Sequence, residues 1–237
     1  MRDYCPGMAD DPVFLITGAS TGIGAATARL ASEAGYRVVL AARSEDKLRG
    51  LAEELGGDDR ALVVRCDVTE WADNEAMVAA ALEAYGRIDV VFANAGFGAA
   101  RGWLKETPEH WRSMVLTNVL GAAYTTRAAL PAVIEARGHV LLTSSVAGRR
   151  ALKGSLYSCT KHAVTAMAEA LRQDVNETGV RVTSIEPGMV DTPFFDNGAG
   201  EGALQAEDIA RAVMYAVAQP PHVDVNEMLI RPTAQPT

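Results

Sequence analysis

Short apolar runs alternate with amphipathic stretches along most of the chain. Six runs rich in Val, Ile and Leu predict strands at 13–17, 37–42, 61–66, 88–95, 138–144 and 180–187. Helices are predicted at about 22–34, 45–55, 71–85, 108–136 in two pieces, 156–178 and 206–218, with a last strand near 227–231. The first five runs are almost continuously apolar, which is typical of parallel strands covered on both faces.

This alternation predicts an α/β fold with right-handed crossovers. We expect a Rossmann-like, doubly wound parallel sheet with helices on both faces. No repeat or linker divides the sequence, so residues 12–237 are expected to form a single domain and residues 1–11 a flexible N-terminal tail. A glycine-rich stretch follows the sixth strand, and residues 189–205 within it are expected to form a substrate loop, either a mobile lid or a plain connection.

The composition excludes several classes of function. The chain of 237 residues has a formal net charge of -8, which argues against binding to nucleic acids or anionic membranes. Its three cysteines show no metal-ligand spacing, so we expect no metal and reduced thiols. With no signal-peptide core and no long uncharged apolar stretch, a cytoplasmic protein is expected.

A glycine-rich turn lies between the first strand and the first helix, in the sequence TGASTGIG at residues 17–24. Glycines allow a tight turn and let a diphosphate approach the backbone amides, and a helix N-terminus adds unpaired N–H groups and partial positive charge. In this position the turn predicts a nucleotide site.

Tyr157 and Lys161 are four residues apart in a predicted helix and therefore share one face. An ammonium beside a phenol favours the phenolate, so we expect Lys161 to lower the pKa of Tyr157. Taken alone, the pair is more typical of a surface lysine one turn from a half-buried tyrosine, so the rest of the chain must decide between the two.

Together the motifs resemble those of the single-domain short-chain dehydrogenases/reductases. These are T-G-x-x-x-G-x-G (17–24), N-A-G (94–96), Asn118, S-S-V-A-G (144–148), Y-x-x-x-K (157–161) and P-G (187–188), in the family's order. The resemblance implies an oxidoreductase that interconverts a carbonyl and a secondary alcohol by hydride transfer from a nicotinamide cofactor. A catalytically silent regulator or scaffold of the same fold is the alternative.

By this resemblance, Tyr157 is the general acid or base, and Lys161 both lowers its pKa and holds the nicotinamide ribose. Asn118 corresponds to the asparagine that links this pair to water in a proton relay. The motif assigns Ser145 as the serine that binds the substrate carbonyl, whereas the usual interval to the tyrosine favours Ser144. We favour Ser145, and strand alternation allows only one of the two to serve.

The resemblance also implies the residues that bind the cofactor. They are Gly18, Ser20, Thr21, Gly22, Ile23, Gly24, Arg43, Asp67, Val68, Asn94, Ala95, Gly96, Tyr157, Lys161, Pro187, Gly188, Val190 and Thr192. Where an NAD site usually has an acid, the second strand ends before Arg43, and a guanidinium suits a 2′-phosphate. NADP is therefore favoured over NAD, although Arg43 could also be a plain surface residue.

Aromatic and apolar residues of the loops at the strand ends are the candidates for binding a small-molecule carbonyl or alcohol. Phe97, Trp103, Met189, Phe194 and Phe195 are expected to face a mainly apolar substrate pocket. Family members commonly associate through the helices at 108–136 and 156–178, so the resemblance implies a homotetramer or homodimer.

Overall fold

A computed structural model describes residues 11–100, 102–194 and 200–235. Seven parallel strands form the central sheet in the order β3-β2-β1-β4-β5-β6-β9. They are β1 (Val13–Thr17), β2 (Arg37–Ala42), β3 (Ala61–Arg65), β4 (Val90–Ala93), β5 (His139–Thr143), β6 (Arg181–Pro187) and β9 (Glu227–Ile230). Strand order reverses on either side of β1, and the crevice at such a switch point is where open α/β sheets bind ligands.

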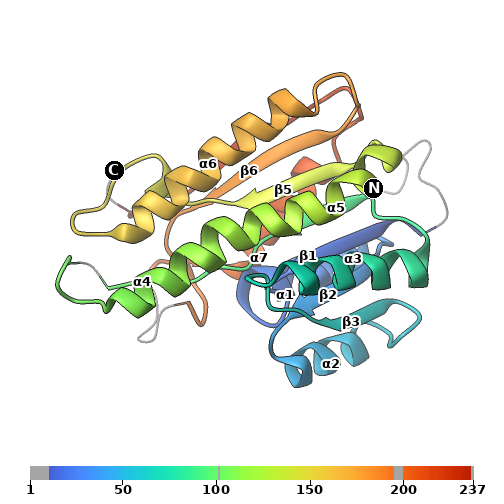
Figure 1. The fold of residues 1–237 in the computed structure, drawn as a ribbon, viewed down its shortest axis with the longest axis horizontal. Helices are drawn as coiled ribbons and strands as arrows, with labels where there is room; N and C mark the ends of the chain where they lie inside the picture. The colour runs from blue at the N-terminus through green and yellow to red at the C-terminus, as the bar shows by residue number, and fades with distance from the viewer. Residues whose placement is uncertain (1–10, 101, 195–199, 236–237) are drawn as a thin grey trace.

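Helices cover both faces of this sheet. The helices are α1 (Gly22–Glu33), α2 (Glu45–Glu54), α3 (Trp71–Tyr85), α4 (Pro108–Val115), α5 (Ala122–Ala136), α6 (Leu156–Asp174) and α7 (Ala206–Val217). One hydrophobic core joins the sheet to α3, α5 and α6, and a second joins it to α1, α2 and α7. Figure 1 shows α5 and α6 extending along β5 and β6. None of the described helices is both long and apolar enough to cross a membrane.

The predicted Rossmann-like fold is confirmed, with strand and helix bounds within a few residues of those expected from the apolar pattern. Two local predictions need correction. The segment at 108–136 is not broken, because a π-helical turn, η1 (Leu116–Gly121), joins α4 directly to α5. The loop after β6 also contains two short paired strands, β7 (Val190–Asp191) and β8 (Leu204–Gln205).

Most of the predicted N-terminal tail, residues 1–10, lies outside the described residues. Asp11, its last residue, is fixed to the domain, because its carboxylate pairs with Arg37 at 2.6 Å and with Arg60 at 3.4 Å.

His139, the first residue of β5, is a buried histidine beside the neighbouring strand. Its Nε2 lies 2.7 Å from Oγ1 of Thr183, which in turn donates to the Val225 carbonyl oxygen at 2.6 Å. Its Nδ1 has no hydrogen-bond partner within the described part of the chain. Burial, reinforced by the positive charge of Arg181, lowers the pKa of His139 well below 6.5.

We therefore predict that acid destabilises the fold through His139. Below about pH 6.5 the unfolded chain binds a proton at this residue that the folded chain does not, so the free energy of unfolding falls as pH falls. Urea unfolding should show a loss of more than about 1 kcal/mol between pH 7.5 and 5.5 beyond that of a His139→Gln variant. Glutamine keeps an N–H donor for Thr183 but does not titrate, so equal pH dependence in both proteins would refute the assignment.

Candidate active site

A cavity of 670 Å³ at the carboxyl edge of the sheet is lined by segments that follow all seven of its strands. Of the residues predicted to bind cofactor or act in catalysis, those lining it are Gly18, Ser20, Thr21, Gly22, Ile23, Arg43, Asp67, Val68, Asn94, Ala95, Gly96, Ser145, Tyr157, Lys161, Pro187, Gly188, Val190 and Thr192. Gly24 and Asn118 do not line the cavity, but each contacts a residue that does: Gly24 packs against Gly18, and Asn118 accepts a hydrogen bond from the Phe97 amide. The sequence motifs therefore converge on one site.

The glycine turn has the backbone that a diphosphate cradle requires. Gly18 and Gly22 have φ values of +68° and +54°, in the left-handed region that favours glycine. A side chain at Gly24 would place its Cβ 2.4 Å from the Gly18 carbonyl oxygen, so this glycine permits close packing of helix against turn. Within the described structure no side chain caps α1, and its first turn carries no acid. These features fit a bound phosphate.

Three polar side chains join the ends of β1, β4 and β5. The Thr17 Oγ1 accepts a hydrogen bond from the Asn94 amide at 3.1 Å, and the Asn94 side chain donates to the Thr17 carbonyl oxygen at 3.1 Å. The Thr143 hydroxyl donates to Asn94 Oδ1, also at 3.1 Å. This network fixes the position of the β5 end, from which Thr143 and Ser145 reach the cavity.

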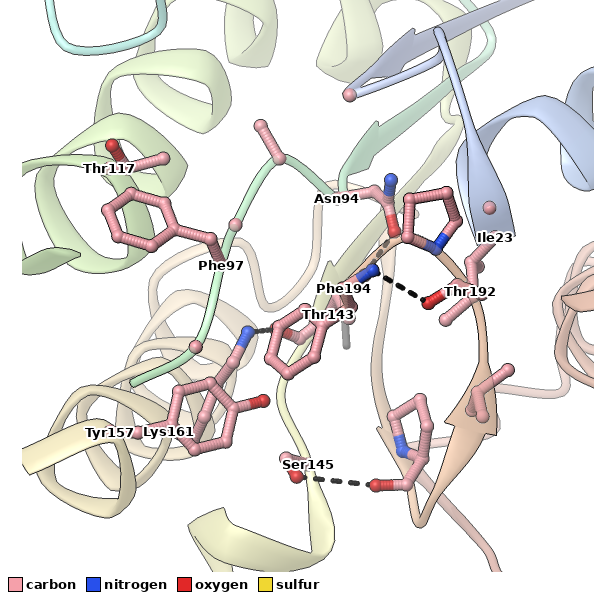
Figure 2. A pocket seen from close by; sticks show the side chains of 18 of the residues that line it. Ile23, Asn94, Phe97, Thr117, Thr143, Ser145, Tyr157, Lys161, Thr192 and Phe194 are labelled. Atoms are coloured by element: carbon pink, nitrogen blue, oxygen red, sulfur yellow. Dashed lines mark hydrogen bonds between the residues drawn. The ribbon is translucent and has the colours of Figure 1, made fainter. Parts of the chain in front are cut away.

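Lys161 is buried within α6, with its side chain directed at the end of β5. Its Nζ donates to the Thr143 carbonyl oxygen at 2.7 Å (Figure 2). Burial lowers the pKa of Lys161 to about 8. The lysine is therefore a buried group that changes charge close to neutral pH.

The phenol of Tyr157 lies next to this lysine, with Nζ of Lys161 5.6 Å from the ring centroid. Figure 2 shows the Tyr157 hydroxyl directed to the side of the cavity where Ser145 lies. Burial raises the pKa of Tyr157 to about 12, and a hydrogen bond with the Ser145 side chain offsets this only in part. The expected lowering of this pKa by Lys161 is thus not observed, because loss of hydration dominates for both groups.

Both candidate serines line the cavity, but their hydroxyls have different partners. The Ser144 hydroxyl lies 2.9 Å from the Lys161 carbonyl oxygen and 2.7 Å from the Thr165 hydroxyl, so it is committed to packing against α6. The Ser145 hydroxyl borders the cavity, donates to the Pro187 carbonyl oxygen at 3.3 Å and accepts from the Ala147 amide at 3.1 Å. Of the two, Ser145 is the serine placed beside Tyr157.

Asn118 lies in η1, and its amide joins three segments around the site. Its Oδ1 accepts from the Phe97 amide at 3.0 Å, and its Nδ2 donates to the Phe97 carbonyl oxygen at 2.9 Å and to the Thr160 hydroxyl at 3.1 Å. π-Helical turns recur at functional sites because they reorient a side chain within a helix. Here the turn holds the loop after β4 against α6.

Arg43 follows β2 and Asp67 follows β3, and both line the cavity. In the strand order these two strands lie on the other side of β1 from β5, against which the Tyr157 helix packs. Burial would raise the pKa of Asp67, but hydrogen bonds from Thr69 and the charges of Arg43 and Arg65 outweigh it and lower the pKa. Arg43 is exposed at the cavity, and the nearby Glu45 forms its ion pair with Arg49 instead. The guanidinium of Arg43 is therefore placed to meet an anion.

The predicted substrate residues have different outcomes. Phe97, Met189 and Phe194 line the cavity, and the Phe194 ring lies 5.7 Å from the Tyr157 ring. Phe195 lies outside the described residues. The prediction that Trp103 faces the pocket is wrong, because its ring meets the Trp111 ring edge to face at 5.1 Å and does not line the cavity.

Other cavity residues had no recognisable signal in the sequence. They include His110, Leu152, Ser155 and Gln235. His110 lies on α4 with its Nε2 3.1 Å from the Gly98 carbonyl oxygen, and only the tertiary fold brings it to the loop after β4. Nowhere in the described ranges do three or more His, Cys, Asp or Glu side chains form a metal-binding group.

Comparisons with known proteins agree with this geometry. A family model described as short chain dehydrogenase matches residues 12–200. An uncharacterized oxidoreductase of Staphylococcus aureus (strain MRSA252) is 40% identical over 226 residues, which are 94% of this chain and 97% of that protein.

Solved structures show the same fold over almost the whole chain. The alcohol dehydrogenase of the archaeon Thermococcus sibiricus, complexed with 5-hydroxy-NADP, has a TM-score of 0.89 at 33% identity, covering 95% of this chain and 98% of that one. The closed form of a serine dehydrogenase complexed with NADP+ has a TM-score of 0.90 at 32% identity, covering 95% and 96%. With its fold, its motifs and these relatives in agreement, the chain belongs to the short-chain dehydrogenase/reductase family.

Proposed function

We propose that this protein is an NADP(H)-dependent oxidoreductase that interconverts a carbonyl and a secondary alcohol. The observation that carries the proposal is the meeting of Tyr157, Ser145 and Lys161 in the cavity that the glycine turn also lines. A nucleotide-binding scaffold would need the glycine turn alone. A buried tyrosine and lysine beside a serine hydroxyl are the groups that proton transfer to a carbonyl oxygen requires.

In the direction of reduction, Tyr157 donates its phenolic proton to the carbonyl oxygen of the substrate. Its raised pKa keeps the phenol protonated at neutral pH, which is the form of a general acid. The Ser145 hydroxyl, beside that phenol, binds the same oxygen. A bound nicotinamide supplies the hydride for the carbonyl carbon. In alcohol oxidation Tyr157 takes the proton back.

Lys161 and Asn118 support this proton transfer without contacting the carbonyl oxygen of the substrate. An ammonium at Lys161 stabilises the phenolate left after donation, and its pKa of about 8 lets its charge change at little cost. Lys161 also holds the ribose hydroxyls of the cofactor. Asn118 fixes the loop after β4 against α6. In the proposed proton relay it would link Tyr157 and Lys161 to water.

Residues from separate strands would hold the dinucleotide. The diphosphate would lie at the turn from Gly18 to Gly24, the adenine beside Asp67 and Val68, and the nicotinamide beside Val190 and Thr192, which line the cavity. Thr192 packs against Gly22, since a Cβ at Gly22 would lie 3.1 Å from Thr192 Cγ2. The substrate loop and the glycine turn are therefore in contact. Ala95 and Gly96, which carry little or no side chain, also line this cavity.

The choice of NADP rests on Arg43 and on the complexes of related proteins. Arg43 is exposed at the cavity, after a strand that ends in alanines rather than an acid. The related alcohol dehydrogenase and serine dehydrogenase are complexed with 5-hydroxy-NADP and NADP+. The proposal includes assembly as a homodimer or homotetramer, as is common in the family. The free thiols of the described cysteines, Cys66 and Cys159, support a cytoplasmic location.

Replacing Tyr157 by Phe should abolish turnover while leaving cofactor binding almost unchanged. Loss of a general acid typically lowers kcat by about 10²- to 10⁴-fold. Oxidation of NADPH or reduction of NADP+ would be followed with a panel of secondary alcohols, serine and the matching carbonyl compounds, and binding by fluorescence titration.

Tyr215→Phe, an exposed tyrosine on α7, is the matched control and should keep full activity. Retained turnover in the Tyr157 variant would remove Tyr157 from its role. Tight NADPH binding by the unaltered protein without turnover of any panel member would instead favour the silent-regulator alternative.

Replacing Arg43 by Ala should weaken NADPH binding by about 10- to 100-fold, as expected for a lost charge-assisted hydrogen bond. NADH binding should change by less than about twofold, since NADH has no 2′-phosphate. Arg49→Ala, on the same helix-strand unit but outside the cavity, should affect neither. Equal losses for NADPH and NADH, or tighter NADH binding by the unaltered protein, would contradict NADP selection by Arg43.

A further inference from the structure

The C-terminal segment, residues 231–235, turns back onto the loop that leaves β6. Pairing of β6 with β9 ends at Pro187 and Ile230, where the Gly188 amide donates to the Ile230 carbonyl oxygen at 2.7 Å. The chain then forms a turn closed by a hydrogen bond of 3.0 Å from the Gln235 amide to the Pro232 carbonyl oxygen. This turn returns the Gln235 side chain to the cavity wall.

The Gln235 side chain accepts a hydrogen bond from a backbone amide at the start of the predicted substrate loop, residues 189–205. Its Oε1 accepts a hydrogen bond of 2.9 Å from the Met189 amide. On its other side, the Met189 carbonyl oxygen accepts from the Leu204 amide at 2.9 Å, where β7 pairs with β8. Both polar backbone groups of Met189 are therefore fixed, directly before Val190 and Thr192.

Packing around Gly188 shows that the C-terminal segment is seated closely. A Cβ at this position would lie 2.2 Å from Gln235 Oε1, 3.0 Å from Pro232 Cδ and 3.1 Å from Arg231 Cα. Pro232 is itself buried. The glycine of the P-G motif is thus required here because the C-terminal segment occupies the space that a side chain would take.

We propose that Gln235 is a positioning residue for the nicotinamide end of the bound dinucleotide. The inference rests on the proposed function, in which Val190 and Thr192 face the nicotinamide. Anchoring the Met189 amide restricts the backbone of that segment before the ligand arrives, so less ordering is required on binding. The adenosine end is contacted by residues after β2 and β3, which Gln235 does not touch.

The test compares two ligands that differ only in the nicotinamide end. Binding of NADP+ and of 2′-phospho-ADP-ribose would be measured by calorimetry for the unaltered protein, Gln235→Leu and Gln235→Glu. Leucine removes the acceptor oxygen, so NADP+ should bind about threefold to tenfold more weakly, the range for one lost hydrogen bond. Binding of 2′-phospho-ADP-ribose should stay within about twofold, and glutamate, which keeps an acceptor, should restore NADP+ binding.

Gln219→Leu, the same change at the end of α7 and outside the cavity, is the matched control and should alter neither affinity. Equal weakening of both ligands by Gln235→Leu, or weakening of neither, would overturn the positioning role while leaving the proposed function intact. If the unaltered protein bound neither ligand, the proposed function would fail and this inference with it.

Discussion

The burial of Lys161 is the constraint on which the rest of the site depends. A lysine amine withdrawn from water needs a hydrogen-bond acceptor, and here the Thr143 carbonyl oxygen at the end of β5 supplies it at 2.7 Å. Thr143 is held in place by its pairing with Ile185 of β6 and by the hydrogen bonds that tie it through Asn94 to β1. The backbone carbonyl oxygen of Lys161 accepts a hydrogen bond from the Ser144 hydroxyl. Lys161 therefore attaches α6 to the end of β5 through both its side chain and its backbone. Tyr157, one turn earlier, is consequently held at the cavity wall.

Close approach of backbones is the second requirement, and small residues meet it. A Cβ at Gly148 would lie 2.4 Å from the Ser144 hydroxyl, and one at Gly121 would lie 2.6 Å from the Val68 side chain. A Cβ at Gly148 would also lie 2.6 Å from Thr165 Oγ1, so this glycine lets the turn after Ser145 approach α6. Gly121 in the same way lets η1 approach the loop after β3. Asn118 lies three residues before Gly121 in η1, so the packing of Gly121 against Val68 also helps to position Asn118. An ion pair of 2.7 Å between Arg149 and the buried Glu186 joins the Ser145 segment to β6.

Much of this arrangement could be predicted from the sequence, because strand ends and helix starts are determined by local pattern. Apolar runs and the turn at 17–24 located the sheet and the nucleotide site. The pKa of Tyr157 could not be predicted, since spacing reveals the neighbouring Lys161 but not the loss of hydration that both groups share. Trp103 and Gln235 show the same limit: whether a loop side chain faces the cavity depends on contacts with distant segments, Trp111 in one case and Met189 in the other.

The site depends most directly on Lys161 being a buried amine that changes charge near neutral pH beside Tyr157. The sequence has only four lysines, Lys47, Lys105, Lys153 and Lys161, so NMR of protein labelled with carbon-13 at lysine Cε can follow each one. The Lys161 resonance, identified by its absence in Lys161→Arg, should titrate with a pKa of about 8. A midpoint near the usual lysine value of about 10.4 for this resonance would show that burial does not govern the titration of Lys161.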